Sequence, residues 1–289
     1  AAVNTTVTSV TTTSREAYTR DNKEVQALME KLEPAEDFYR VEKKTRKTKN
    51  DGAWMNFPSV SLFSSTANAD LTKFFKRMGC EASTNAYSIT GSTPLVDSLL
   101  SVRYALYSEY IPNTDLVNYI QESGGTYLYE NLYTLPLGFV LPYDLADNWQ
   151  YQMENPAEVQ NDLCLLLGTD DVLVPVETEV SGSGCTFTAD MAGEYYVYIQ
   201  NKKVKNVKAS LPSGEKNFSN VDRGYLLEMG NLSEGSRITL TPGESGETLT
   251  AAVYRFSPRA MIQVYDRLSQ SPLHLDDWRD TKLTGTVTA

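Results

Sequence analysis

The secondary structure that the sequence predicts changes character near Asp170. Beyond this point, turns rich in Gly, Asn, Ser and Pro separate short β-rich runs at residues 172–180, 185–188, 194–200, 204–211, 224–229, 237–241 and 248–256. Short strands at such regular spacing predict an antiparallel β-sandwich of the jelly-roll or immunoglobulin-like type. A helix is predicted at 258–268, and a last strand begins close to the end of the chain and is cut short there.

Before Asp170, predicted strands and helices alternate. Strands at 59–63, 85–90 and 102–107 enclose amphipathic helices at 69–78 and 94–100, and further strands at 126–131 and 137–141 precede a helix at 156–167. This alternation is typical of βαβ units. We therefore predict an α+β chain of two domains: an α/β domain with a mixed, largely parallel sheet (1–168), and a β-sandwich domain with a terminal helix and truncated last strand (169–289).

Charge and composition exclude several classes of function. The 289 residues carry a net charge of −11, which disfavours binding to nucleic acid. The one dense basic run, RVEKKTRKTK at 40–49, is interpreted as a solvated linker between strands. With a single histidine, His274, the usual zinc sites and Ser-His-Asp triads lack a component. The sparse cysteines Cys80, Cys164 and Cys185 form neither a disulfide framework nor a metal motif, and their redox state is left open. We expect no metal, cofactor or catalytic residue.

Both ends of the chain indicate a fragment. The first residue is not methionine, no signal peptide is present, and no apolar run approaches the roughly 20 residues of a spanning helix. We expect the chain to be the excised, soluble part of a longer surface protein.

The polar cluster Ser64-Ser65-Thr66-Ala67-Asn68 lies between a predicted strand and a predicted helix. Binding crevices of open α/β sheets lie at such places, so the cluster is a candidate cradle for a sugar or phosphate. Capping of the helix by Asn68 is the favoured interpretation, because caps need the same residue types. The carboxylates Asp97, Glu109, Asp115 and Glu130 are candidates for glycoside hydrolysis, although no spacing pairs them.

Several phrases in the first half resemble the YfhO family of bacterial multi-spanning membrane proteins. They are DFYRVE (37–42), SLFSSTAN (61–68), NAY (85–87), LLSVRY (99–104), YEN (129–131), LPLGF (135–139), NP (155–156) and QN (160–161). Their order and spacing across 37–168 carry the resemblance. Ser101 and Arg103 depart from the glycine and lysine that the family tends to have. Within these phrases and the polar cluster, the candidate substrate-binding residues are Ser64, Ser65, Asn68, Tyr104, Glu130 and Asn131.

The resemblance implies a membrane glycosyltransferase of the GT-C type that glycosylates teichoic acids with sugar from a lipid-phosphate carrier. Its catalytic acids would lie outside this chain, near the membrane helices. The chain would then be an accessory, substrate-organising domain on the outer face of the cytoplasmic membrane. Its partners would be the membrane-embedded part of the same protein and a lipid-linked sugar or envelope glycopolymer. The alternatives are a surface carbohydrate-binding module and a glycoside hydrolase. The 18 tyrosines suit a carbohydrate-binding surface, because a tyrosine ring can pack on one side while its hydroxyl meets a polar ligand.

Overall fold

The computed structural model describes residues 14–32, 37–279 and 282–287. Its N-terminal half contains a four-stranded sheet of order β1-β5-β7-β6, with β1 Arg40–Lys43, β5 Val102–Tyr107, β7 Thr126–Asn131 and β6 Val117–Ser123. A small second sheet, β2-β4-β3, comprises Leu62–Phe63, Ala86–Tyr87 and Ala82–Ser83. The helices of this half are α2 Arg15–Thr19, α3 Asn22–Met29, α4 Asp51–Met55, α5 Ala69–Arg77, α6 Pro94–Leu99, α7 Leu145–Asn148 and α8 Pro156–Leu166.

The main sheet is mixed, as predicted, but less of it is parallel than expected. Only β1 and β5 pair in parallel, whereas β5–β7 and β6–β7 are antiparallel. The β6–β7 pair is a hairpin whose first strand, β6, lies outside the predicted strands. Gly124 and Gly125 both have positive φ, 54° and 81°, which is the backbone that a tight two-residue hairpin turn requires. The strand predicted at 137–141 is also wrong, because Phe139 makes only an isolated bridge to Pro272.

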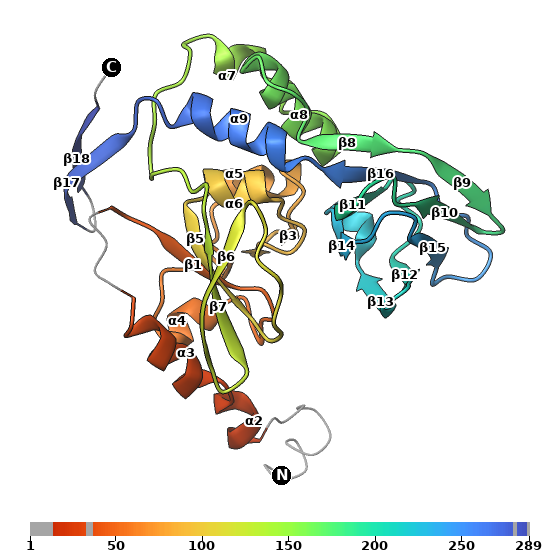
Figure 1. Cartoon of the computed structure of the whole chain (residues 1–289), viewed down its shortest axis with the longest axis horizontal. Coiled ribbons are helices and arrows are strands. Elements are labelled where there is room, and N and C mark those ends of the chain that lie inside the picture. The colour runs from red at the N-terminus through yellow and green to blue at the C-terminus, as the bar shows by residue number, and fades with distance from the viewer. Residues whose placement is uncertain (1–13, 33–36, 280–281, 288–289) are drawn as a thin grey trace.

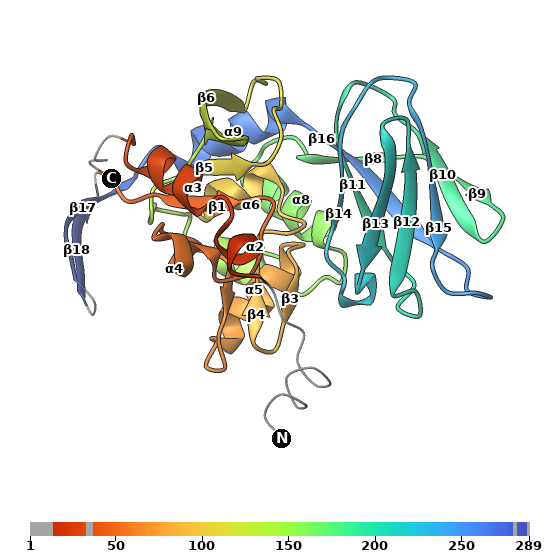
Figure 2. The same cartoon turned by 90° about the horizontal axis from the view of Figure 1, so that it is seen from below.

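The C-terminal half contains the predicted antiparallel β-sandwich (Figures 1 and 2). One sheet has the order β13-β12-β15-β10-β9, formed by Gly214–Ser219, Asn206–Leu211, Arg237–Pro242, Gly184–Thr188 and Thr178–Ser181. The other has the order β14-β11-β16-β8, formed by Leu227–Leu232, Gly193–Ile199, Ala251–Phe256 and Leu173–Val176. The apolar residues between the two sheets, such as Phe187, Tyr195 and Val253, form its core.

The two halves share a hydrophobic core. Helix α9 (Pro258–Leu268) follows the sandwich and lies along α6 and α8 of the first half (Figure 1). Its residue Met261 belongs to a buried cluster with Leu95 and Ala157 from the first half and Tyr196 and Phe256 from the sandwich. The predicted domain boundary between residues 168 and 169 remains a prediction. Two domains divided there would be joined by this apolar contact.

The last strands form a hairpin at the edge of the molecule. β17 (Leu273–Arg279) pairs antiparallel with β18 (Lys282–Val287) and with neither large sheet (Figure 1). The final strand that the sequence predicted as truncated is therefore the second strand of a two-stranded unit.

Candidate functional site

A cavity of about 510 Å³ lies where the α/β half meets the sandwich. The first half contributes residues from the end of β1, the start of α6 and the loop after β5, and the sandwich contributes residues of β11, β14 and the β12–β13 turn. Its polar lining includes Lys44, Ser92, Asp97, Tyr107, Glu109, Asn131, Tyr133, Glu194, Tyr196, Lys216 and Glu228. A concave site of this size with converging polar groups at a domain junction is where small ligands bind.

The loop before α6 fixes one wall of the cavity. Thr93 caps α6, and its hydroxyl donates to Gln160 Oε1 of α8 at 2.6 Å. Pro94 occupies the first helical turn, where its fixed φ fits. Gly91 has φ +82°, and a Cβ there would lie 2.4 Å from the Gly79 carbonyl oxygen and 2.6 Å from that of Leu226. Its N–H donates to Glu228 Oε1 of the sandwich at 2.7 Å. The loop is thus held between the two halves.

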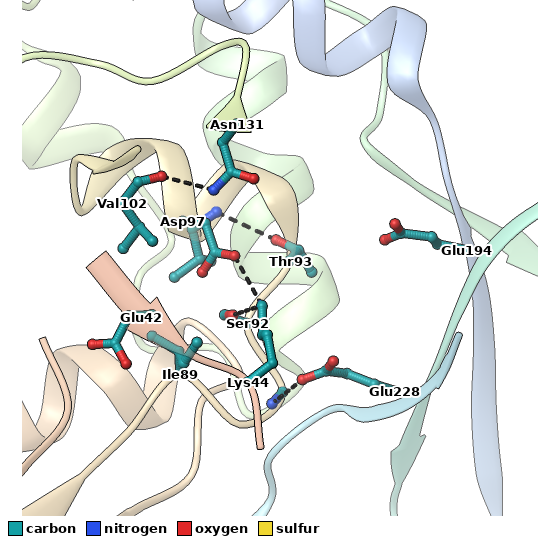
Figure 3. Close-up of polar contacts among 12 residues, drawn as sticks. Glu42, Lys44, Ile89, Ser92, Thr93, Asp97, Val102, Asn131, Glu194 and Glu228 are labelled. Carbon is teal, nitrogen blue, oxygen red and sulfur yellow. Dashed lines mark hydrogen bonds and ion pairs between the residues drawn. The ribbon is translucent and has the colours of Figure 1, made fainter. Parts of the chain in front are cut away.

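Lys44 and Asp97 form a largely buried ion pair at this wall (Figure 3). Lys44 Nζ lies 3.0 Å from Asp97 Oδ2, and only 8% of the Asp97 side chain is exposed. Burial lowers the pKa of the Lys44 ammonium, but the Asp97 carboxylate and the nearby Glu228 outweigh this and hold its pKa well above the usual value. Lys44 therefore keeps its charge at neutral pH. Among the described residues, Asp97 Oδ1 has no hydrogen-bond partner.

The sandwich supplies the facing carboxylates. In Figure 3 the side chain of Glu194 extends from β11 toward α6. The Tyr196 hydroxyl donates to Glu194 Oε2 at 3.0 Å. Burial by the cavity walls raises the pKa of Glu194, against the effect of this hydrogen bond and of Lys44. Burial and the neighbouring Glu194 also raise the pKa of Tyr196, so its hydroxyl stays a donor. The lining contains four carboxylates (Asp97, Glu109, Glu194 and Glu228) and two ammonium groups (Lys44 and Lys216).

Of the six predicted substrate-binding residues, only Asn131 lines this cavity. Its Nδ2 donates to the Val102 carbonyl at 2.7 Å, and its amide oxygen is turned away from Val102 (Figure 3). Tyr104 is buried in a separate core with Leu106 and Leu128, and Glu130 is ion-paired with Arg103 at 2.9 Å.

The polar cluster lies on the outside of the molecule, away from the cavity lining. Asn68 Oδ1 accepts the N–H groups of Asp70 and Leu71 at 2.8 and 3.1 Å, which is the capping geometry. Ser64 hydrogen-bonds Thr66, and Ser65 is exposed. The structure does not bring these residues together with Asn131, and their role in binding a ligand stays a prediction.

Sequence reasoning missed Lys44, Glu194 and Glu228. The interpretation of the basic run as a solvated linker is wrong, because its cations point inward to acidic partners: Lys43 to Asp21, Lys44 to Asp97 and Lys49 to Glu81. The available signal was that the basic run begins inside a strand, RVEK (β1), rather than in a loop. No local pattern around Glu194 or Glu228 indicates a site, because their position depends on contacts between distant parts of the chain.

The three cysteines are free and buried. Burial raises the pKa of all three thiols, that of Cys164 to about 11, so they remain protonated and unreactive at neutral pH. Within residues 14–32, 37–279 and 282–287, no three His, Cys, Asp or Glu side chains come together in a way that could hold a metal ion.

A profile of the family described as "Bacterial membrane protein YfhO" matches residues 1–172, which is more than half of the chain. The chain belongs to the YfhO family. The match covers every element that builds the α/β side of the cavity and ends where β8 begins, so the sandwich side lies beyond it. No curated protein and no solved structure shows significant similarity to this YfhO-family chain. None of the helices in the described part of the chain has the length and apolarity that crossing a bilayer requires.

Proposed function

We propose that this YfhO-family chain is a substrate-organising domain of a membrane glycosyltransferase and that it binds a sugar of its envelope substrate in the cavity between its halves. The observation that carries the proposal is the cavity itself. Its lining combines an amide, hydroxyls and carboxylates with tyrosine rings, which suits a ligand that has many hydroxyls and apolar ring faces. Membership of a bacterial membrane protein family supports action at a membrane.

The charge of the lining favours a neutral or amino sugar over a phosphate. Four carboxylates against two ammonium groups repel a polyanion, as does the net charge of −11. We therefore expect the domain to hold the sugar part of a glycopolymer such as teichoic acid, or of a lipid-linked donor. The phosphates would stay outside the cavity, the domain would face the outer side of the membrane, and the transfer chemistry would take place outside this chain.

Calorimetric titration of the chain with glucose, galactose, N-acetylglucosamine and teichoic acid fragments tests the proposal. We expect at least one of these sugars to bind. Glu194→Gln, which replaces a charged acceptor by a neutral amide, and Asn131→Ala, which removes an amide, should each weaken that binding about tenfold. Ser65→Ala, on the outer loop, is the matched control and should bind as the unaltered chain does. If no sugar binds, or if only Ser65→Ala weakens binding, the proposal is wrong.

Glycoside hydrolysis is a second candidate, favoured by one observation. Asp97 and Glu194 come from opposite halves to one cavity, and the raised pKa of Glu194 suits a general acid. Incubation with oligosaccharides of the sugars that bind, followed by chromatography of the products, decides between the two functions. A hydrolase would release shorter sugars, and Glu194→Gln would abolish this release; a binding domain would leave them intact.

A further inference from the structure

Five tyrosines form a continuous aromatic cluster beside the cavity. Tyr107, Tyr110, Tyr119, Tyr127 and Tyr129, here called the tyrosine platform, contact one another edge to face. The ring centroids lie 5.2 Å apart for Tyr107–Tyr129, 5.6 Å for Tyr119–Tyr129, 5.7 Å for Tyr110–Tyr119 and 6.1 Å for Tyr110–Tyr127. The sheet and the loop after β5 bring them together from three parts of the sequence.

The register of the sheet explains why these rings share one face. Tyr107 pairs with Tyr127 and Tyr119 pairs with Tyr129, and directly paired residues lie on the same side of a sheet. The opposite side carries Leu106 and Leu128, which are buried in the core with α3 and α4. The tyrosine side is open at its outer end, where Tyr110 is 58% exposed and Tyr119 is 37% exposed.

The loop that carries Tyr110 is anchored by hydrogen bonds. The buried Tyr129 hydroxyl accepts from the Ile111 N–H at 2.7 Å and donates to the Ile111 carbonyl at 2.9 Å. Asn113 Oδ1 accepts the Tyr119 N–H at 2.7 Å, which ties the same loop to β6. An exposed ring on a fixed loop loses little conformational entropy when a ligand covers it, so such a ring contributes well to binding.

The platform is continuous with the cavity. Tyr107 belongs to both, and Ile111 and Val117, neighbours of Tyr110 and Tyr119, also line the cavity. A chain of sugars that starts in the cavity would therefore pass over the exposed rings.

We propose that the tyrosine platform binds the sugar units next to the one held in the cavity, so that the ligand is an oligosaccharide or polymer rather than a single sugar. This inference rests on the proposed function. The apolar face of a pyranose ring fits the face of a tyrosine, and the phenolic hydroxyls can hydrogen-bond the hydroxyls of the sugar.

Titration with a mono-, di- and tetrasaccharide of the same sugar tests this inference. We expect the affinity of the unaltered chain to rise with sugar length. Tyr110→Ala and Tyr119→Ala should lower the affinity for the tetrasaccharide about tenfold and leave that for the monosaccharide unchanged. Tyr110→Phe keeps the ring and should keep most of the affinity. Tyr143→Ala is the matched control, because Tyr143 is 98% exposed and lies outside the platform and the cavity.

The two proposals fail in different ways. In one outcome, the monosaccharide binds and Glu194→Gln weakens its binding, but longer sugars bind no more tightly and Tyr110→Ala has no effect on affinity. The platform is then not a glycan subsite, and the cavity proposal stands. If no sugar of any length binds, both proposals are wrong. Circular dichroism of each variant verifies that the loss of a ring has not unfolded the hairpin.

Discussion

At the scale of single residues, the wall of the cavity contains an ion pair that is largely shielded from water. Lys44 and Asp97 lie 3.0 Å apart with 18% and 8% of their side chains exposed. Removing one partner of such a pair leaves the other charge buried without compensation, which costs far more than the pair itself contributes. Exposed pairs, such as Arg237–Glu179 with 64% and 74% exposure, are weakened by water and salt.

We predict that Asp97→Asn lowers the free energy of unfolding by about 3 kcal/mol, because it leaves the Lys44 ammonium buried and unpaired. Glu179→Gln, which breaks an exposed pair, should change it by no more than about 0.5 kcal/mol. Urea denaturation of both variants measures the difference. Equal effects of the two substitutions would show that the Lys44–Asp97 pair is effectively solvated.

The pH dependence of stability should reveal Glu194. Burial raises the pKa of the Glu194 carboxyl above its value in the unfolded chain, so the folded state binds the carboxyl proton more tightly. The stability of the fold therefore falls as the pH rises from the unfolded pKa through the folded pKa. Glu194→Gln keeps an acceptor for the Tyr196 hydroxyl. This variant should be more stable than the unaltered chain at neutral pH, but not at a pH below the unfolded pKa of Glu194. Thermal unfolding over a pH series measures this.

Glu81 provides a comparison of opposite sign for the same series. Burial raises the pKa of Glu81, but Lys49 and Ser88 outweigh this and lower it overall, so Glu81 stabilises the fold above the ordinary glutamate pKa and ceases to do so as the pH falls. Glu81→Gln should therefore be less stable than the unaltered chain at neutral pH, and the difference should shrink in acid. The same sign for both variants would contradict the assignment.

At the scale of elements, local sequence signals determine the ends of the helices. Asn68, Thr93, Asn155 and Ser257 all cap helices with their side chains, and proline occupies the first turn of α6, α8 and α9. The hairpin β6–β7 depends equally on local chemistry, since Gly124 and Gly125 supply its turn.

We predict that Asn68→Ala destabilises the chain by about 1 kcal/mol through loss of the α5 cap, without any change in sugar affinity. Ser65→Ala, in the same loop but outside the cap, should alter neither quantity. Chemical denaturation and calorimetry on the two variants separate capping from binding. A fall in sugar affinity for Asn68→Ala would contradict this expectation and support binding by the polar cluster.

At the scale of the whole molecule, the two halves meet through an apolar core and through close backbone contacts. Leu226 N–H of the sandwich donates to the Gly79 carbonyl at 2.8 Å, and Gly91 is enclosed between these two residues. The cavity exists because the halves are held in this arrangement, with α9 packed along α6 and α8 (Figure 1).

We predict that Gly91→Ala lowers the free energy of unfolding by at least about 3 kcal/mol, since it adds a backbone clash to the strain of a positive φ. Gly125→Ala has a similar φ of +81° but no atom within 4 Å of the added Cβ, and should cost about 1 kcal/mol. Equilibrium unfolding compares the two. If Gly125→Ala proves as costly as Gly91→Ala, the contact between the halves is looser than described.

The sequence by itself determined the elements with strong local signals. Helices α5, α6, α8 and α9 and strands β5 and β7 agree with their predicted positions, because capping residues, prolines and hydrophobic periodicity act within a few residues. The sandwich forms in the predicted part of the chain, but the predicted strand at 172–180 is divided between β8 and β9 in different sheets, and β13 lies outside the predicted runs. The phrases between 37 and 168 likewise identified the family that the profile of residues 1–172 confirms.

Only the tertiary structure decided which polar residues meet. Lys44 and Asp97 are 53 positions apart, and Gly91 and Glu228 are 137 positions apart. Nothing within a local window can encode such pairs, since they depend on how two sheets and the helices between them pack. The cavity and the tyrosine platform are products of that packing, and for this reason the residues that we propose for function come mostly from outside the set that the sequence suggested.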